Sequence, residues 1–195
     1  MRFGSVFLII SAIVFCSEQA VAEGAREFGP YVGFGFSRTL ARAQQPGVET
    51  SLAGWGNSAE AGLDVPFSSS LGLTVAVEIG ETDLRNTYKA DDYLDQTTIK
   101  SKGLRAGLFY RNLTVGYGSR NVTLDVKAVS STTGSSAAHL EGAGSYGFAS
   151  FSIDHKDLMR GSLELQANSS ELNSFSYTDY TIGLKAYILV HGLLD

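Results

Sequence analysis

The chain has 195 residues, of which 18% are charged and 44% hydrophobic, and its formal net charge at pH 7 is −5. This length fits one domain, and the charged content lies below the roughly 25% of ordinary soluble domains. With 15 Lys and Arg against 20 Asp and Glu, there is no basic excess of the kind that nucleic-acid binders carry. Together with the 22 glycines, this composition indicates a protein whose outer surface is not wholly wetted by water.

The first 22 residues have the pattern of a cleaved export signal. Arg2 supplies a positive start, Val6–Phe15 is a short apolar run, and Ala20-Val21-Ala22 is a small-x-small cleavage site. The apolar run is shorter than the about 20 residues that a membrane-spanning helix needs. The only cysteine, Cys16, lies inside this leader and lacks the preceding small residue of a lipid-anchor site. The sequence therefore predicts a signal peptide at 1–22 and an exported domain without cysteine at 23–195.

After the leader, the hydrophobic pattern has a period of two, which indicates β-strands. We expect eight of them, at Phe28–Leu40, Leu52–Pro66, Leu71–Leu84, Thr97–Arg111, Leu113–Val126, Leu140–Ile153, Leu158–Ala167 and Tyr177–Val190. One face of most strands carries Leu, Val, Ile, Phe and Ala, and the other carries Gly, Ser, Thr and isolated charges. In the fifth strand the apolar pattern jumps a residue before Val122, which predicts a bulge near Arg120. The facing of the sixth strand is ambiguous.

The connections between the strands alternate in length. Those after the odd strands are long and polar, and those after the even strands are short: Ala41–Ser51, Arg85–Gln96, Lys127–His139 and Asn168–Ser176 against Phe67–Ser70, Asn112 and Asp154–Asp157. An even strand number with long loops at one end is the plan of outer-membrane barrels, and lipid tolerates no open strand edge. The sequence therefore predicts an all-β fold, a closed antiparallel up-and-down transmembrane β-barrel of about eight strands, with both termini at the periplasmic end.

The composition of the two faces predicts which one meets lipid. A soluble periplasmic lipocalin-like barrel, the alternative, would be apolar inside and rich in Lys and Glu outside. The small polar face found here suits the narrow lumen of an eight-stranded barrel. Four outward aromatic residues also lie near the expected membrane interfaces, Trp55 and Tyr180 at the loop end and Phe67 and Tyr110 at the turn end.

The leader, the eight alternating strands and the alternating connections resemble the small outer-membrane β-barrels of the OmpA transmembrane-domain and OmpX type. The resemblance covers essentially the whole mature chain. One departure concerns the C-terminus, because such barrels usually end on an aromatic residue and this chain ends on Asp195. Either the signal is displaced inward to Tyr187, or the register of the last strand differs from the one expected here. We expect a monomeric, non-enzymatic outer-membrane protein with a structural or surface-loop role and no cofactor or metal. Its expected partners are outer-membrane lipid, lipopolysaccharide and the barrel assembly machinery, and not nucleic acid.

Charged residues on the inward face should pair with one another, because an isolated charge in a narrow lumen costs several kcal/mol. The OmpA-like resemblance also implies a salt-bridge network there. Its expected members are Glu60, Glu78, Arg105, Arg160, Glu164 and Lys185, with Asp64, Arg111 and Arg120 near the ends. Such a network could fill and stabilise the barrel, or it could gate a narrow small-solute pore. The sequence leaves both open, because the pairing depends on strand stagger.

Two polar features lie at or near the expected loop end. The acidic segment Lys89–Asp95 has oxygen ligands for Ca²⁺ or Mg²⁺ but lacks the glycine and final glutamate of a calcium loop, so a solvated loop is favoured. Lys100 and Lys102 lie on the outward face, where their ammonium groups could meet lipopolysaccharide phosphates.

The three histidines are candidate catalytic residues, because enzymes exist on this scaffold. His155 and His191 fall on the periplasmic side. His139 lies near the outer rim, close in sequence to Glu141 and to three serines, Ser135, Ser136 and Ser145. A Ser–His–acid arrangement would make the chain an outer-membrane lipid-modifying acyl hydrolase. A triad is recognised by its geometry, however, and a wetted rim histidine is the favoured interpretation.

Overall fold

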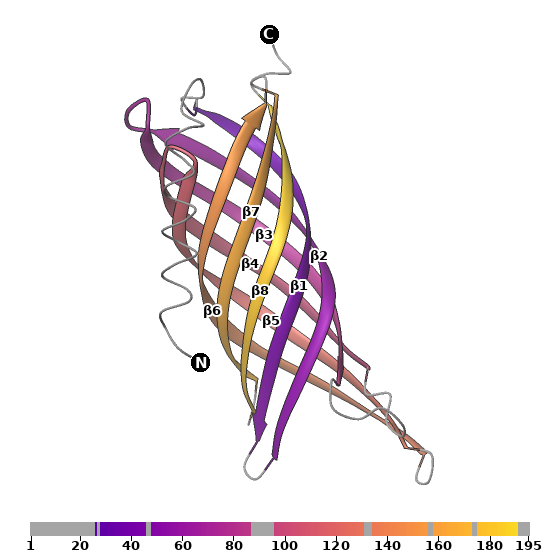
Figure 1. Cartoon of the computed structure of the whole chain (residues 1–195). Coiled ribbons are helices and arrows are strands. Elements are labelled where there is room, and N and C mark those ends of the chain that lie inside the picture. Colours follow the sequence, from indigo (N-terminus) through magenta and orange to yellow (C-terminus); the bar gives the residue numbers. More distant parts are fainter. Residues whose placement is uncertain are drawn as a thin grey trace, which may run out of the picture.

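The computed structural model describes residues 26, 28–45, 48–86, 96–130, 134–155, 158–172 and 175–190. These residues form eight antiparallel strands: β1 (Gly29–Gln45), β2 (Val48–Pro66), β3 (Leu71–Asn86), β4 (Gln96–Tyr110), β5 (Leu113–Ser130), β6 (Gly134–His155), β7 (Met159–Leu172) and β8 (Phe175–Leu189). Each strand pairs with the next one in sequence, and β8 pairs with β1, so the sheet closes into a barrel (Figure 1). The predicted fold class is confirmed. No helix long and apolar enough to cross a membrane occurs among the described residues.

The strands are tilted, and their register determines the tilt. The chain of paired residues that starts at Val32 on β1 runs through Ala61, Val77, Leu104, Ser119, Ser145, Ser169 and Thr178 and returns to β1 at Arg42. The path therefore closes 42 − 32 = 10 residues further along β1, which is the shear number of the barrel. For eight strands, this stagger gives a tilt of about 40° and an interior that side chains just fill.

Several strands continue into segments that the sequence places in long loops. β5 and β6 have 18 and 22 residues. Their ladder runs to the pair Ser130↔Gly134, whereas the sequence predicts a loop at Lys127–His139. Pairing satisfies the backbone N–H and C=O groups of the described residues of this segment, among which Val129 also favours extended backbone. Among the described residues the β5–β6 hairpin reaches furthest from the turn end of the barrel (Figure 1, lower right).

One local prediction is wrong. β5 pairs without interruption with both β4 and β6, so there is no bulge near Arg120. Arg120, Val122 and Leu124 all lie on the luminal side, and the sequence pattern changes there because the lumen itself becomes apolar. The facing of β6 is also settled, since four alternate residues are buried in the lumen: Tyr146, Phe148, Ser150 and Ser152.

The turn between β4 and β5 contains Arg111 as well as Asn112. Arg111 has a φ of 53°, a left-handed conformation that two-residue hairpin turns require. Its guanidinium lies 5.5 Å from the centroid of the Tyr110 ring and is exposed. Arg111 therefore takes no part in the luminal charges with which the sequence analysis grouped it.

The outer surface carries a continuous apolar band. Outward side chains such as Phe34, Leu104 and Leu184 are 60–67% exposed. On β3 the band runs from Leu71 to Ile79, about nine residues, which at about 3.3 Å per residue and a tilt of about 40° is roughly 23 Å along the axis. Outer-membrane barrels carry an apolar band of about 25 Å. A lipocalin-like barrel has the inverse arrangement, so the structure contradicts that alternative.

The four aromatic residues expected at membrane interfaces all lie on the outer surface. Trp55 and Tyr180 flank the band at the loop end, and Phe67 and Tyr110 flank it at the turn end, each more than half exposed. Trp55 stacks on Phe36 with ring centroids 5.0 Å apart. This placement is compatible with interfacial belts, and the assignment to membrane interfaces stays a prediction.

Candidate functional site: the barrel lumen

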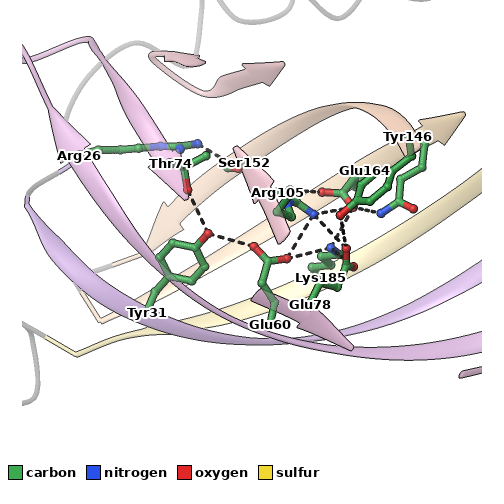
Figure 2. A network of polar contacts seen from close by, with 11 residues as sticks. Arg26, Tyr31, Glu60, Thr74, Glu78, Arg105, Tyr146, Ser152, Glu164 and Lys185 are labelled. Carbon is green, nitrogen blue, oxygen red and sulfur yellow. Dashed lines mark hydrogen bonds and ion pairs between the residues drawn. The ribbon is translucent and has the colours of Figure 1, made fainter. Parts of the chain in front are cut away.

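Five charged side chains meet in the middle of the lumen (Figure 2): Glu60 of β2, Glu78 of β3, Arg105 of β4, Glu164 of β7 and Lys185 of β8. We call them the central cluster. Arg105 donates to both carboxylate oxygens of Glu164, at 3.1 and 2.6 Å, and lies 3.2 Å from Glu60. The Lys185 ammonium lies 2.8 Å from Glu78 and 2.9 Å from both Glu60 and Glu164. Each residue has the inward parity of its strand, and the shear of 10 brings all five within about two residues of one height.

The central cluster has one more carboxylate than it has cations, and three neutral donors compensate for this. The Tyr31 hydroxyl donates to Glu60 at 2.9 Å, and the Tyr146 hydroxyl donates to Glu78 at 2.8 Å. Gln166 donates to Glu164 at 2.7 Å. Every carboxylate of the cluster therefore has a neutral donor in addition to its cations, as buried charges require.

A second cluster closes the turn end of the lumen. Arg160 forms ion pairs of 2.6 Å with both Asp64 and Asp154. Arg26, which precedes β1, donates to Ser152 at 3.2 Å and lies 4.5 Å from the centroid of the Phe109 ring. Both arginines are buried. Arg160, which the sequence groups with the central cluster, belongs here instead, and Arg26 was not predicted because no strand pattern reaches it.

An apolar layer fills the other end of the lumen. Arg120 first pairs with Asp179 at 2.8 Å, and Asn168 also donates to Asp179. Beyond this pair, side chains from seven of the eight strands form one buried apolar group, which we call the apolar layer: Ala41, Leu52, Leu84, Ile99, Val122, Leu124, Leu172 and Tyr177. None is more than 8% exposed, so these side chains fill the lumen at this height. Sequence analysis missed it, because Leu and Val residues look the same whether they face lipid or the lumen.

Two small cavities separate these barriers. One of about 60 Å³ lies between the central cluster and Arg120, lined largely by Gly, Ser and Thr. The other, of about 20 Å³, lies between the central cluster and Arg160, beside Tyr31 and Thr74. A water needs roughly 10–15 Å³, so these spaces suit a few waters and no larger solute. The lumen is therefore closed at three successive heights.

His139 lies outside the lumen, on the outward face of β6 beyond the apolar band. Its Nδ1 lies 2.6 Å from Asp125 and its Nε2 lies 3.2 Å from Glu141. These hydrogen bonds, first to Asp125 and then to Glu141, raise the pKa of His139 above its usual value. Ser145 lies six residues away along the strand, about 20 Å at the usual rise. Among the described side chains no serine hydroxyl reaches the imidazole, so the Ser–His–acid arrangement is not assembled there.

Several candidate features fall outside the described residues. The acidic segment Lys89–Asp95 lies there, as do His191 and the side chains of His155, Ser135 and Ser136. The side chains that are described include no group of three or more His, Cys, Asp or Glu arranged to hold a metal. Tyr187 is described, and it points into the lumen, where its ring covers Gly33.

No family model matches the sequence, and no curated protein matches it. Solved structures do match. Ail, the attachment invasion locus protein of Yersinia pestis, aligns with a TM-score of 0.54 at 12% identity, over 82% of this chain and 99% of Ail. Neisserial surface protein A aligns with a TM-score of 0.50 at 16% identity, over 85% of this chain and 99% of that protein.

This chain has the fold of the small eight-stranded outer-membrane barrels. The resemblance to the OmpX type is thus confirmed at the level of the fold. A second Ail structure, in complex with the heparin analogue sucrose octasulfate, aligns with a TM-score of 0.52 at 11% identity, over 82% of this chain and 99% of Ail. At these identities the likeness extends to the fold alone, and ligands and activity must be argued from the residues of this chain.

Proposed function

We propose that this chain is an integral protein of the bacterial outer membrane, closed to solutes, which holds a folded extracellular sheet for contact with ligands or surfaces. The observation that carries the proposal is the polarity of the barrel. An apolar band roughly 23 Å high surrounds a lumen that is polar at its centre, and water would not solvate such an outer face. The predicted signal peptide at 1–22 supplies the route of export.

The strands are longer than a membrane crossing requires. A transmembrane strand needs about 9–11 residues. β5 and β6, with 18 and 22 residues, therefore extend well beyond the height of Trp55 and Tyr180. The apolar layer lies inside the start of this extension and stabilises it as a hydrophobic core. The parts of β5 and β6 beyond the height of Trp55 and Tyr180 thus form a folded sheet, which we call the platform. Such a sheet favours a binding role for the strands as well as for the loops.

Cellular fractionation with gel mobility tests the membrane assignment. Protein from the outer-membrane fraction, run with and without boiling, should shift in mobility, because a closed barrel resists detergent until it is heated. Soluble periplasmic protein with no shift would overturn the proposal.

Labelling of single cysteines tests the orientation, since the only native cysteine lies in the predicted leader. Glu141→Cys places a thiol on the exposed platform, and Ser69→Cys places one in the exposed turn between β2 and β3. A membrane-impermeant maleimide should label the first variant on intact cells and the second only after permeabilisation. The reverse pattern would show that the platform faces the periplasm.

A narrow pore gated by the central cluster is the second candidate. Two observations favour it, namely the polar cavities on either side of the cluster. The Arg160 cluster and the apolar layer would also have to open, however, so a closed lumen is the better-supported state. Planar-bilayer recording of the purified barrel decides between the two, because a pore gives discrete conductance steps.

A further inference from the structure

A groove of about 560 Å³ lies on the outer wall of the barrel, across β1 to β5. It does not belong to the lumen. Its lower part is lined by the apolar side chains of Phe34, Ala59 and Ile79, and its upper part by polar side chains that include Lys100 and Lys102. The groove therefore joins the apolar band to the polar surface above it.

The groove exists because a small residue lies between two large ones. The register places Phe34, Ala59, Ile79 and Lys102 side by side on four neighbouring strands, all on the outward face. Ala59 forms the floor, and the rings and branches of Phe34 and Ile79, which are 63% and 57% exposed, form the walls. An extended hydrocarbon chain fits such a channel, because the apolar contacts on both sides replace those with bulk lipid.

The two lysines lie at the height where lipid headgroups are expected. Counted through the register, Lys100 and Lys102 are within about two residues in height of Trp55 and Tyr180. Both side chains are exposed, and neither makes an ion pair with any described residue. Even Glu81, which faces Lys100 across the strands and is the single acid among the residues that line the groove, is not bonded to it.

We propose that this groove binds one phosphorylated, acylated glycolipid of the outer leaflet. One acyl chain lies along Phe34, Ala59 and Ile79, and a phosphate lies between the ammonium groups of Lys100 and Lys102. The side-chain amides of Asn57 and Asn121, which also line the groove, donate to the sugar or ester oxygens. Charge complementarity favours this occupant, since two cations without an ion-pair partner among the described residues lie above an apolar channel, and they match an anionic headgroup above an acyl chain.

The proposal rests on membrane insertion, and its test uses the full barrel folded in detergent. Native mass spectrometry measures binding of bisphosphorylated lipid A, of dephosphorylated lipid A and of inorganic phosphate. The wild-type barrel should retain one lipid A molecule and should bind the other two probes much more weakly. K100Q/K102Q should weaken lipid A binding by about tenfold or more, as loss of two charge-assisted contacts implies.

Two matched controls separate the groove from general effects. R85Q/R111Q removes the same charge from exposed sites outside the groove, and it should bind lipid A like the wild type. A59F fills the groove floor and should abolish binding, whereas A61F adds the same ring lower on the same face of β2 and should not.

Equal binding of lipid A by K100Q/K102Q and by the wild type would overturn the lipid site and leave the membrane assignment intact. Binding of inorganic phosphate as tight as that of lipid A would do the same. A wild-type protein that is soluble and shows no heat-dependent mobility shift would overturn both.

Discussion

Replacing Lys185 by methionine tests whether charge balance holds the central cluster together. The cluster contains three carboxylates and two cations, so its formal charge is −1. K185M leaves Glu60, Glu78 and Glu164 around Arg105 alone, with a formal charge of −2. Removing one partner of a buried ion pair costs about 3–5 kcal/mol, because the remaining charge stays desolvated without compensation. We expect a loss of this size in the free energy of unfolding.

Glu78→Gln is the matched control because it shifts the charge in the opposite direction. It leaves two carboxylates and two cations, with Glu60 and Glu164 both within 3.2 Å of Arg105 and 2.9 Å of Lys185. Lys185 and Tyr146 donate to different oxygens of Glu78. In E78Q the carbonyl oxygen can still accept from Lys185, and the Tyr146 hydroxyl can rotate to accept from the new NH2 group. The expected cost is therefore about 1 kcal/mol, in the range of one ordinary hydrogen bond.

Urea unfolding of the barrel in lipid vesicles, followed by circular dichroism, measures both variants. K185M/E78Q has the wild-type formal charge of −1 and should be more stable than K185M. If E78Q lowered the free energy of unfolding as much as K185M, charge balance would not be what stabilises the cluster, and the reasoning would be refuted.

Three more predictions concern other parts of the barrel. In planar bilayers K185M should still not conduct, because the Arg160 cluster and the apolar layer remain closed; discrete steps from this variant would place the only effective barrier at the central cluster. A Cβ at Gly118 would lie 2.5 Å from atoms of the Tyr146 ring, so G118A should lower stability by about 1–3 kcal/mol, whereas G161A, with nothing within 4 Å, should be close to neutral in the same urea assay. The raised pKa of His139 means that its pairing with Asp125 and Glu141 is fully present below about pH 6.5 and is lost as pH rises through the raised value. Proteolysis of the β5–β6 hairpin should therefore quicken over that range in the wild type and not in H139Q.

The inward residues could be predicted from the sequence, because a period of two assigns each one to a face. Glu60, Arg105 and Glu164 all follow from that rule. Their pairing could not be predicted, since Arg105 meets Glu164 across 59 residues and only the shear of the closed sheet sets the two at one height. One distance between charged residues could be estimated from the sequence. Arg160 and Glu164 lie four residues apart on one strand, about 13 Å, which is too far to share a cluster.

The apolar layer shows what periodicity cannot supply. Val122 and Leu124 alternate with polar residues as lipid-facing residues do, so the sequence suggests that the strand changes face near Arg120. In the structure the strand keeps its face and the surroundings change. The ends of β5 and β6 could not be predicted for a related reason, since the Ser, Thr and Ala residues between 127 and 139 suit a polar loop as well as a strand whose outward face meets water.

Both faces of the barrel change polarity at the same height. Below Trp55 the outward face is mainly Leu, Val, Ile and Phe around a lumen of charged, hydroxyl and aromatic side chains. Above it the outward face carries Asp83, Lys100 and Glu141 around the apolar layer. A soluble barrel has no reason to invert along its axis, because one solvent surrounds all of it. Two media do supply a reason: hydrocarbon below, where the outward face must be apolar and the polar groups inside must pair with one another, and water above, where a hydrophobic core forms inside. The inversion therefore supports the proposed membrane assignment from the residues of this chain, and on that proposal it predicts that Lys100 and Lys102 lie at the outer boundary of the membrane.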